Sequence, residues 1–314
     1  MMSTLPKVVA FGGGHGLAAT LRALKLLTDQ VTAVVTVADD GGSSGRLRGE
    51  FDCLPPGDLR MALAALCGDD SDGRLWADVL QTRFSGTGPL GGHAVGNLLI
   101  AALWQRNPDP VAGLDQVGRL LNAQGRVLPM CATPLRICAE VRGADPEDPH
   151  GMSVVEGQHN VAVTEGVVER IALRPSNPPA CQEALWSVRD ADYLVLGPGS
   201  WFTSVVPHLL VPQLRQAILD SKAAKICVMN LVDVDETQGY SPSEHLDILV
   251  EHCPGLRLDA VIADPRFADR DSRLAELVSS LGARLVVEDL GVRDGSARHD
   301  PFLLASALAD IMDL

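Results

Sequence analysis

Aromatic side chains are scarce in this sequence, and no run of basic residues is present. Phe, Trp and Tyr together make up 4% of the 314 residues. Proteins that bind single-stranded nucleic acid stack the bases on aromatic rings, so this scarcity argues against such a function. The formal net charge of −14 repels DNA, RNA and anionic lipid unless basic residues are concentrated somewhere. We therefore expect no nucleic-acid partner.

Long apolar runs and paired cysteines are also lacking. The run LLIAALW, near the middle of the chain, is far too short to span a bilayer. The N-terminus has no long apolar segment that ends in a cleavage site. The seven cysteines are scattered and none forms a C-x-x-C pair, which argues against a zinc site or a disulfide framework. These features predict a cytoplasmic protein without membrane insertion, with mostly buried, inert thiols.

The chain alternates short apolar strands with helical patterns. Strands are expected at residues 7–11, 31–38, 193–197, 224–230, 259–264 and 283–289. Helices are expected near 17–27, 59–67, 96–104, 111–122, 180–190 and 212–221. Near-continuous apolar strands are typical of a parallel sheet covered on both faces. We therefore expect an α/β fold in a single domain, 1–314, with three αβα layers around a doubly wound, mostly parallel sheet.

Residues 125–175 have a different pattern. Leu135, Ile137, Ala139 and Val141 alternate with polar residues, as in a half-exposed strand. A turn or loop is expected at 143–151, and residues 161–173 are strand-like again. We expect this segment to form a small β-rich insertion on the α/β body.

Polar and glycine-rich strings follow the expected strands. Four are short strings, GGGHG, DDGGSSGR, GPGS and VRDGSARHD, and two are single polar residues at strand ends, Asn230 and Asp264. Ligands of open parallel sheets bind beyond the carboxyl ends of the strands, where the strand order reverses. Any one such loop is weak support, since every fold needs loops there. Together the six features predict a site for a large polar ligand.

The first string contains Gly12, Gly13, Gly14, His15 and Gly16. Glycines let backbone N–H groups approach a phosphate, and the N-terminus of the following helix adds partial positive charge. The alternative is a plain tight turn between strand and helix. The string fits only a permissive variant of the dinucleotide fingerprint and lacks the lysine of a P-loop. His15 either donates to a phosphate oxygen or caps the turn.

The second string begins with two adjacent carboxylates, Asp39 and Asp40. They could bond a sugar hydroxyl, act as a general base, or hold Mg²⁺ bridged to phosphates. The flexible stretch after them offers N–H groups and hydroxyls from Gly42, Ser43 and Ser44. Two arginines at 46 and 48 could close together on an anion. The alternative is a surface Asp-Gly turn with two solvated arginines.

Further candidates lie at helix starts. Asp58 is a good N-cap, whereas Arg60 in a first helical turn is opposed by the helix dipole, which a bound anion would offset. His93 and Asn97 are spaced to share a helical face, and Asn97 interrupts an apolar helix, so it needs a buried partner, either backbone or ligand. Ser200 is either an N-cap or a phosphate or sugar contact.

The sequence resembles the YvcK-like family of gluconeogenesis factors, which belongs to the superfamily of the 2-phospho-L-lactate transferase CofD. The strings that carry the resemblance cover nearly the whole chain: VAFGGGHGL, VTAVVTVADDGGSSGRLR, LPPGDLR, GGHAVGNLLIAA, GRVLP, LVLGPGSWFTSVVPHLLVP, GYSPSEH and ARHD. The string ADDGGSSGRLR and its spacing to PPGD are highly specific. His15 departs from the common family pattern, which has Thr.

The resemblance implies a CofD-like, Rossmann-related fold that binds UDP-sugars, notably UDP-N-acetylglucosamine. It also implies a cytoplasmic regulatory role in cell-wall synthesis, cell shape and growth on gluconeogenic carbon, with no firm enzymatic activity. The transferase branch moves a phospholactyl group to the deazaflavin Fo and uses Mg²⁺. By motif match, nucleotide-sugar contacts are implied for Gly12 to Gly16, Asp39, Asp40, Ser43, Ser44, Arg46, Asn97, Gly199, Ser200 and Arg298.

The expected function is therefore that of a UDP-sugar-binding regulatory protein, because anion-binding groups converge without an evident nucleophile–base pair. One alternative is a Mg²⁺-dependent transferase of the CofD type, with Asp39 or Asp40 as metal ligand or base. Another is an NAD-binding dehydrogenase, which the poor glycine fingerprint disfavours. No cofactor is firmly implied. Cell-wall synthesis proteins and a second copy of the chain remain open as partners. To the implied contacts we add, as ligand-binding candidates, Gly42, Asp58, Arg60, His93 and Asn230.

Overall fold

The computed structural model describes residues 5–145, 147–232, 237 and 239–314. A seven-stranded sheet, with every strand parallel to its neighbours, forms its centre, in the order β10-β9-β8-β7-β1-β2-β3. Its strands are β1 (Val8–Gly12), β2 (Val31–Val35), β3 (Arg126–Pro129), β7 (Tyr193–Leu196), β8 (Ala224–Val228), β9 (Ala260–Ala263) and β10 (Arg284–Val287). The expected parallel α/β sheet is confirmed.

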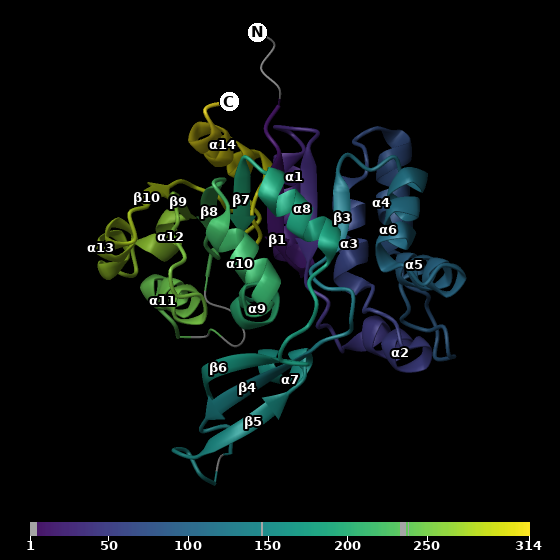
Figure 1. Cartoon of the computed structure of the whole chain (residues 1–314), viewed down its shortest axis with the longest axis horizontal. Helices are drawn as coiled ribbons and strands as arrows, with labels where there is room; N and C mark the ends of the chain where they lie inside the picture. Colours follow the sequence, from purple (N-terminus) through teal and green to yellow (C-terminus); the bar gives the residue numbers. More distant parts are fainter. Residues whose placement is uncertain (1–4, 146, 233–236, 238) are drawn as a thin grey trace.

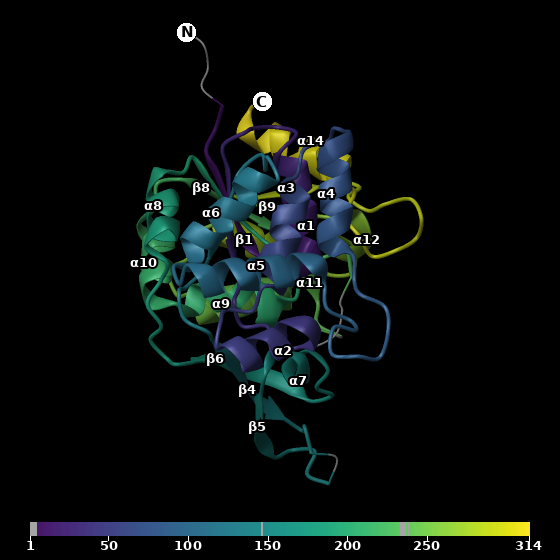
Figure 2. The ribbon, with the colours of Figure 1, turned by 90° about the vertical axis from the view of Figure 1, so that its right-hand side faces the viewer.

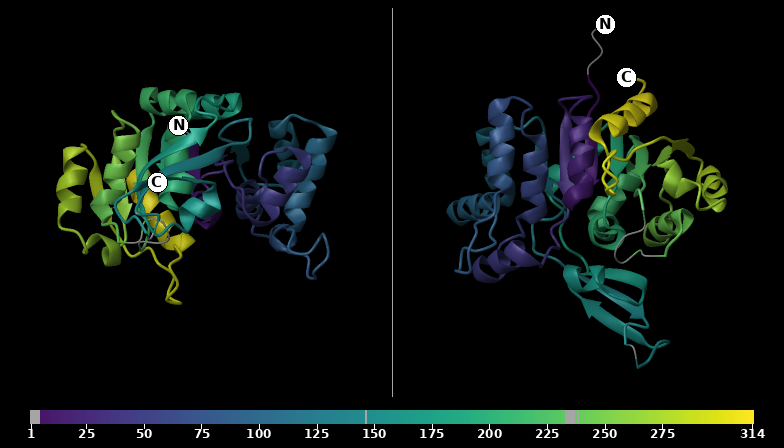
Figure 3. Two further views of the ribbon diagram at one scale, coloured as in Figure 1. Left: turned by 90° about the horizontal axis from the view of Figure 1, so that it is seen from below. Right: turned by 180° about the vertical axis from the view of Figure 1, so that it is seen from behind.

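Helices cover both faces of this sheet. In the first half of the chain they are α1 (Gly14–Leu24), α2 (Gly42–Phe51), α3 (Gly57–Leu66), α4 (Ser71–Gln81), α5 (Val95–Arg106) and α6 (Pro110–Leu120). In the second half they are α8 (Gln182–Asp190), η1 (a π-helical turn, Trp201–Val205), α9 (Val206–Leu210), α10 (Pro212–Asp220), α11 (Pro242–His252), α12 (Pro265–Ala268), α13 (Arg273–Ser280) and α14 (Pro301–Met312). Helices α8 and α10 lie in front of the sheet in Figure 1, whereas α1 and α14 lie in front in the right-hand view of Figure 3. The three expected layers are therefore present.

A small antiparallel sheet, in the order β5-β4-β6, interrupts the chain between β3 and α8. It consists of β4 (Arg136–Arg142), β5 (Met152–Glu156) and β6 (Val167–Arg174), with the short helix α7 (Gln158–Ala162) between the last two strands. This sheet projects below the main body in Figure 1. It follows the carboxyl end of β3, so it lies on the side where the parallel strands end. The expected β-rich insertion is present, but it begins after β3, because residues 126–129 form a strand of the main sheet and do not belong to the insertion.

Two local expectations are wrong. The stretch after Asp40 is not loose, because helix α2 begins at Gly42 and includes both serines and both arginines. The segment 161–173 is not one strand: its first residues finish α7, and the strand starts at Val167. Both errors have one cause. Short helices such as α2 and α7 are stabilised by tertiary packing rather than by intrinsic helix propensity, so the local sequence does not indicate them.

The order in which the chain adds strands to the sheet reverses between β1 and β7. From β1 the chain builds outward through β2 and β3, then returns to β7 on the other side of β1 and continues to β10. The loops that follow β1 and β7 therefore leave a crevice between them. Among the described residues, no helix is long and apolar enough to cross a membrane.

Gly16 lets the loops on either side of this crevice approach closely. A Cβ on Gly16 would lie 2.2 Å from the Pro198 carbonyl oxygen, which is backbone and cannot rotate away. We expect Gly16→Ala to lower the free energy of unfolding by roughly 1–3 kcal/mol, as overpacking does elsewhere. The measurement is urea unfolding without ligand.

Gly49→Ala in α2 is the control for this variant, because a Cβ there meets nothing within 4 Å. It should be neutral or stabilising, since alanine loses less backbone entropy than glycine on folding. Equal stability of the Gly16→Ala variant and the wild type would contradict the close approach.

Candidate functional site

A cavity of about 290 Å³ lies in the crevice between β1 and β7. It is lined by Gly13, Gly14, His15, Gly16, Pro198, Gly199, Ser200, Ser204, Asn230, Leu231, Val232, Ala297 and His299. These residues come from the loops after β1, β7 and β8 and from the segment before α14. Segments far apart in sequence thus meet at the carboxyl edge of the sheet, as the polar strings predicted.

The N-terminus of α1 opens into this cavity. Its N-cap residue is Gly13, no side chain caps the helix, and no acidic residue occupies the first turn. The Asp58 carboxyl group accepts the first of its N–H groups, that of Gly14, whereas no side chain of the described residues accepts those of His15 and Gly16. Unpaired N–H groups and the positive end of the helix dipole together favour a bound anion.

The opposite wall is held by Asn230, at the end of β8. Its side chain accepts a hydrogen bond from the Gly199 N–H at 2.9 Å and donates one to the Gly199 carbonyl at 3.0 Å. Ser200 accepts a hydrogen bond from the Thr203 N–H at 3.2 Å, which makes it the N-cap of the π-helical turn. Of the two readings of Ser200, the structure therefore shows the cap, and it also places Ser200 in the cavity wall.

His299 completes the wall, and the sequence analysis missed it. Its Nε2 donates to the Met229 carbonyl at 3.2 Å, and burial lowers the pKa of this histidine to about 4. His299 is thus neutral at pH 7, with Nδ1 left as an acceptor. His299 lies in the string ARHD, in which its charged neighbour, Arg298, was the residue predicted to contact the ligand. That arginine is 67% exposed, pairs with Asp294, and does not line the cavity.

Asp264 holds the segment 290–300, which carries His299, through a hydrogen bond to its backbone. This fully buried carboxylate accepts the Leu290 N–H at 2.9 Å and pairs with Arg266 at 2.8 Å. Burial alone would raise the pKa of Asp264, but the hydrogen bonds from Arg266 and Leu290 outweigh it and lower the pKa. Asp264 is therefore a structural anchor at the strand end rather than a ligand contact.

A second polar cluster lies at the start of α2. The Ser43 hydroxyl lies 2.9 Å from His93 Nδ1 and accepts a hydrogen bond from Asn97 Nδ2 at 3.0 Å. The Ser43 hydroxyl therefore joins the His93 ring to the Asn97 side chain. Burial, and then Arg46, lower the pKa of His93. Asn97 Nδ2 thus has a buried partner, Ser43, whereas Asn97 Oδ1 is buried without a hydrogen-bond partner among the described residues.

The two adjacent carboxylates diverge. Asp40 accepts the His159 N–H of α7 at 3.3 Å, so it faces the small sheet. Asp39 accepts the Gly41 N–H at 2.9 Å and lies near Asp58, at the start of α3. The structure therefore pairs Asp39 with Asp58 rather than with Asp40. No cluster of three or more His, Cys, Asp or Glu side chains suited to a metal ion occurs in the part of the chain that the structure describes.

Asp58 is not the N-cap of α3, because Pro56 occupies that position. Its carboxyl group accepts the Gly14 N–H, and a Cβ on Gly13 would lie 2.4 Å from its Oδ2. Burial, and then the charge of Asp39, raise the pKa of Asp58 to about 7. The Asp39–Asp58 pair thus lies directly beneath the glycine loop, where it would favour a proton or a cation.

The arginines are dispersed rather than gathered on one anion. Arg46 donates to the Gly91 carbonyl at 2.8 Å, whereas Arg48 lines a different cavity near β4. Residues two apart on a helix point to different sides, so the observed helix separates them. Arg60 is 4% exposed and bonds Gln81, and burial lowers its pKa to about 10. It packs below Gly96 of α5 and does not line the cavity between β1 and β7.

The other two candidates also have structural contacts. Ser44 accepts the Gly57 N–H at 3.0 Å and thereby joins α2 to α3. Gly42 has a φ of +47°, which suits glycine at the first position of α2. Neither residue lines the cavity.

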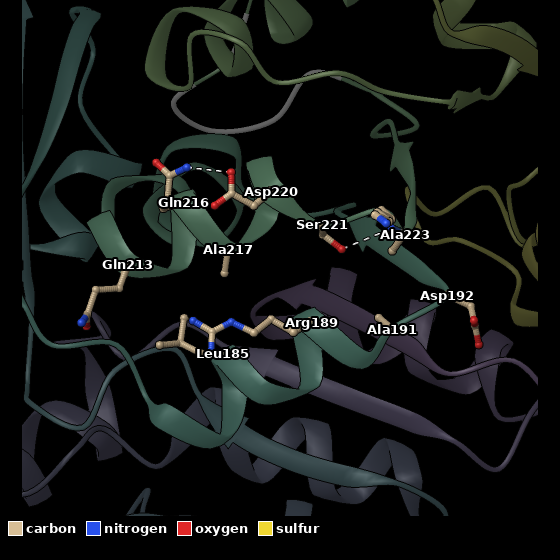
Figure 4. Close-up of a pocket in the computed structure, with 11 residues that line it drawn as sticks. Leu185, Arg189, Ala191, Asp192, Gln213, Gln216, Ala217, Asp220, Ser221 and Ala223 are labelled. Atoms are coloured by element: carbon tan, nitrogen blue, oxygen red, sulfur yellow. Dashed lines mark hydrogen bonds between the residues drawn. The ribbon is translucent and has the colours of Figure 1, made fainter.

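A larger cavity of about 630 Å³ lies elsewhere, between α8 and α10. Figure 4 shows Arg189 and Leu185 on one side and Gln216 and Asp220 on the other. Besides Gln213 and Ala217 of α10, its lining includes residues 191–192 and 221–223, which directly precede β7 and β8. It therefore lies at the amino edge of the sheet, away from the crevice and from every candidate of the sequence analysis.

The chain resembles known proteins over nearly its whole length. Residues 8–291 match the family model described as "2-phospho-L-lactate transferase CofD". The chain is 50% identical over 306 residues to a protein of Mycobacterium tuberculosis strain H37Rv named "Putative gluconeogenesis factor", covering 96% of this chain and 89% of that one. It is 36% identical to the "Gluconeogenesis factor" of Listeria innocua over 317 residues, covering 97% and 95% of the two chains.

A solved structure has the same fold. The crystal structure of a UPF0052 family protein from Bacillus halodurans superposes with a TM-score of 0.85 at 33% identity. It covers 98% of this chain and 99% of that one. The likeness extends over both sheets.

The raised pKa of Asp58 gives a testable pH dependence. Because the folded-state pKa of about 7 lies above the ordinary value of 3.8, the folded protein keeps a proton that the unfolded chain releases. Stability therefore falls as the pH rises between these two values, and Asp58→Asn removes this loss. Relative to wild type, we expect the variant to gain on the order of 1–2 kcal/mol between about pH 5 and pH 8. Urea unfolding at both pH values measures it.

Asp78→Asn is the matched control, because Asp78 is an exposed aspartate of α4. It should leave the pH dependence of the wild type unchanged. If the Asp58→Asn and Asp78→Asn proteins lose stability equally between the two pH values, then Asp58 is not the group that holds the proton.

Proposed function

Since the chain belongs to the CofD family, we propose that it is a regulatory protein that binds the diphosphate of a nucleotide sugar, UDP-N-acetylglucosamine in particular. The observation that carries the proposal is the uncapped N-terminus of α1, which opens with its glycine loop into the cavity between β1 and β7. A diphosphate is the group that such a helix end, at such a place in a parallel sheet, is suited to bind.

The remaining wall residues suit the neutral parts of the same ligand. Ser200, Asn230 and the free Nδ1 of neutral His299 offer hydrogen-bonding groups for sugar or ribose hydroxyls. A volume of about 290 Å³ holds the diphosphate and part of one flanking group. The uridine and the N-acetyl group come from the family resemblance. The cavity supports a phosphorylated, hydroxyl-rich ligand.

A regulatory role agrees with the names of the curated relatives, which are gluconeogenesis factors. On this proposal the bound state acts in the cytoplasm on growth with gluconeogenic carbon, on cell shape and on cell-wall synthesis. The protein partners that read that state would be cell-wall synthesis proteins.

A second candidate is a Mg²⁺-dependent transferase, and one observation favours it. Asp39 and Asp58 pair beneath the glycine loop, and a divalent cation would relieve the repulsion that raises the pKa of Asp58. Such a cation would neutralise phosphate charge at the neighbouring helix end. These two carboxylates are the residues that would hold it.

The test is a thermal-shift and calorimetric titration with UDP-N-acetylglucosamine, with and without Mg²⁺, beside UDP-glucose, GTP and NAD. Ligand at about 100 times its dissociation constant stabilises by roughly 2.7 kcal/mol, which raises the Tm by a few degrees. We expect the UDP-sugars to shift the Tm and NAD to leave it unchanged. A shift with GTP that requires Mg²⁺, and none with UDP-sugars, would favour the transferase instead.

Substitution of two arginines in the loop before α14 tests whether the ligand lies near this loop. Arg298→Ala should reduce the UDP-sugar shift if this side chain leaves Asp294 and closes over the diphosphate. Arg293→Ala is the control, because Arg293 is an equally exposed arginine of the same loop. Equal shifts in both variants would remove Arg298 from the site.

Asn230→Ala should weaken nucleotide-sugar binding independently of Arg298, because it removes the hydrogen bonds that hold the Gly199 loop.

A further inference from the structure

A separate cavity of about 330 Å³ lies where α2 meets the small sheet. Arg48 and Gly45 of α2 line one side, and Arg136, at the start of β4, and Glu156, at the end of β5, line the other. Figure 2 shows α2 lying directly above α7 and the small sheet. This cavity shares no lining residue with the one between β1 and β7.

Its two arginines form no salt bridge within the described part of the chain, although the carboxylates Asp40 and Glu156 also line the cavity. Nη1 of Arg48 is fully buried and has no hydrogen-bond partner there. Burial, and then the charge of Arg136, lower the pKa of Arg48. A guanidinium nevertheless stays charged at pH 7. Two like charges at one cavity, one of them with an unpaired buried N–H group, are costly unless an anion joins them.

The acidic residues of the cavity are engaged elsewhere. Asp40 lies within electrostatic reach of Arg48, but its Oδ1 accepts the His159 N–H at the start of α7. Glu156 forms a salt bridge with Arg174. Neither carboxylate makes a hydrogen bond to Arg48 or Arg136 within the described part of the chain. Neither guanidinium therefore has a carboxylate as a hydrogen-bond partner among the described residues.

We propose that this cavity is a second anion site, in which Arg48 and Arg136 bind the phosphate group of a small metabolite. Guanidinium groups match phosphate oxygens with paired N–H donors, which is the geometry that two converging arginines supply. A concave space of this size suits a small molecule and is too small for a stable protein interface. The bound phosphate would also join α2 to the small sheet, because each arginine comes from one of them.

This linkage would connect the second site to the first. Helix α2 carries Ser43, which bonds His93 and Asn97, and it follows the strand that ends near Asp39. A phosphate that fixes α2 against the small sheet would therefore restrict the neighbouring segment that carries Asp39, which lies near Asp58 beneath the glycine loop. The effect on nucleotide-sugar affinity rests on the proposed function, whereas the anion site itself does not.

The test is calorimetric titration of the full chain with inorganic phosphate at constant ionic strength, since phosphate salts also stabilise proteins non-specifically. We expect saturable binding to wild type, weakened at least about tenfold in Arg136→Gln, which corresponds to about 1.4 kcal/mol. Arg48→Lys keeps the charge but loses the paired donors, and it should retain part of the affinity. Arg170→Gln is the control, because Arg170 is an exposed arginine of the same small sheet outside this cavity.

Titration of the same proteins with UDP-N-acetylglucosamine separates this proposal from the previous one. Loss of phosphate binding in Arg136→Gln with unchanged nucleotide-sugar affinity would support a second site. Failure of the wild type to bind the nucleotide sugar would overturn the proposed function and leave the anion site standing. The anion site is overturned by equal phosphate affinity in wild type and Arg136→Gln, by no saturable binding, or by joint loss of both ligands, which would make the two cavities one site.

Discussion

The contact between the first turn of α1 and the turn after β7 is the constraint on which the rest of the crevice depends. A side chain at Gly16 would collide with the Pro198 carbonyl, so only glycine allows these two backbones to meet. The meeting closes the gap that a doubly wound sheet leaves at its point of reversal. Asn230 then fixes Gly199, and Asp264 fixes the segment before α14. Three loops thereby become the walls of one cavity.

Most polar side chains of the candidate residues near this cavity make structural hydrogen bonds. Fewer groups therefore remain that could bind a ligand. Ser44 joins α2 to α3, Ser43 holds Asn97 and His93, and Asp40 holds α7. Short polar side chains are suited to this work, because they satisfy buried backbone groups at little cost in side-chain entropy. Groups that lack such a partner among the described residues include the helix end at Gly13, Nη1 of Arg48 and Oδ1 of Asn97. The first two favour an anion, whereas Asn97 Oδ1 needs a donor.

The chain is acidic as a whole, yet we propose that both of its candidate sites bind anions. The net charge of −14 is spread over the surface, where salt screens it within a Debye length of about 10 Å. A helix end and the half-buried Arg48 act at contact distance, where screening is weak, whereas Arg136 is exposed. Beneath the first site, Asp39 and Asp58 add a local repulsion that a proton or a divalent cation relieves. The occupancy of that site should therefore be sensitive to both.

The sequence by itself determined the parallel sheet, the insertion and the edge at which the polar loops gather, because apolar periodicity is a local property and strand ends follow from it. It also indicated that Asn97, in an apolar helix, needs a buried hydrogen-bond partner. Only the tertiary structure decided which carboxylates meet, with Asp58 replacing Asp40 beside Asp39, and which arginine faces which cavity. Those outcomes depend on the helical phase of α2, and that helix exists through packing rather than through the propensity of its own residues.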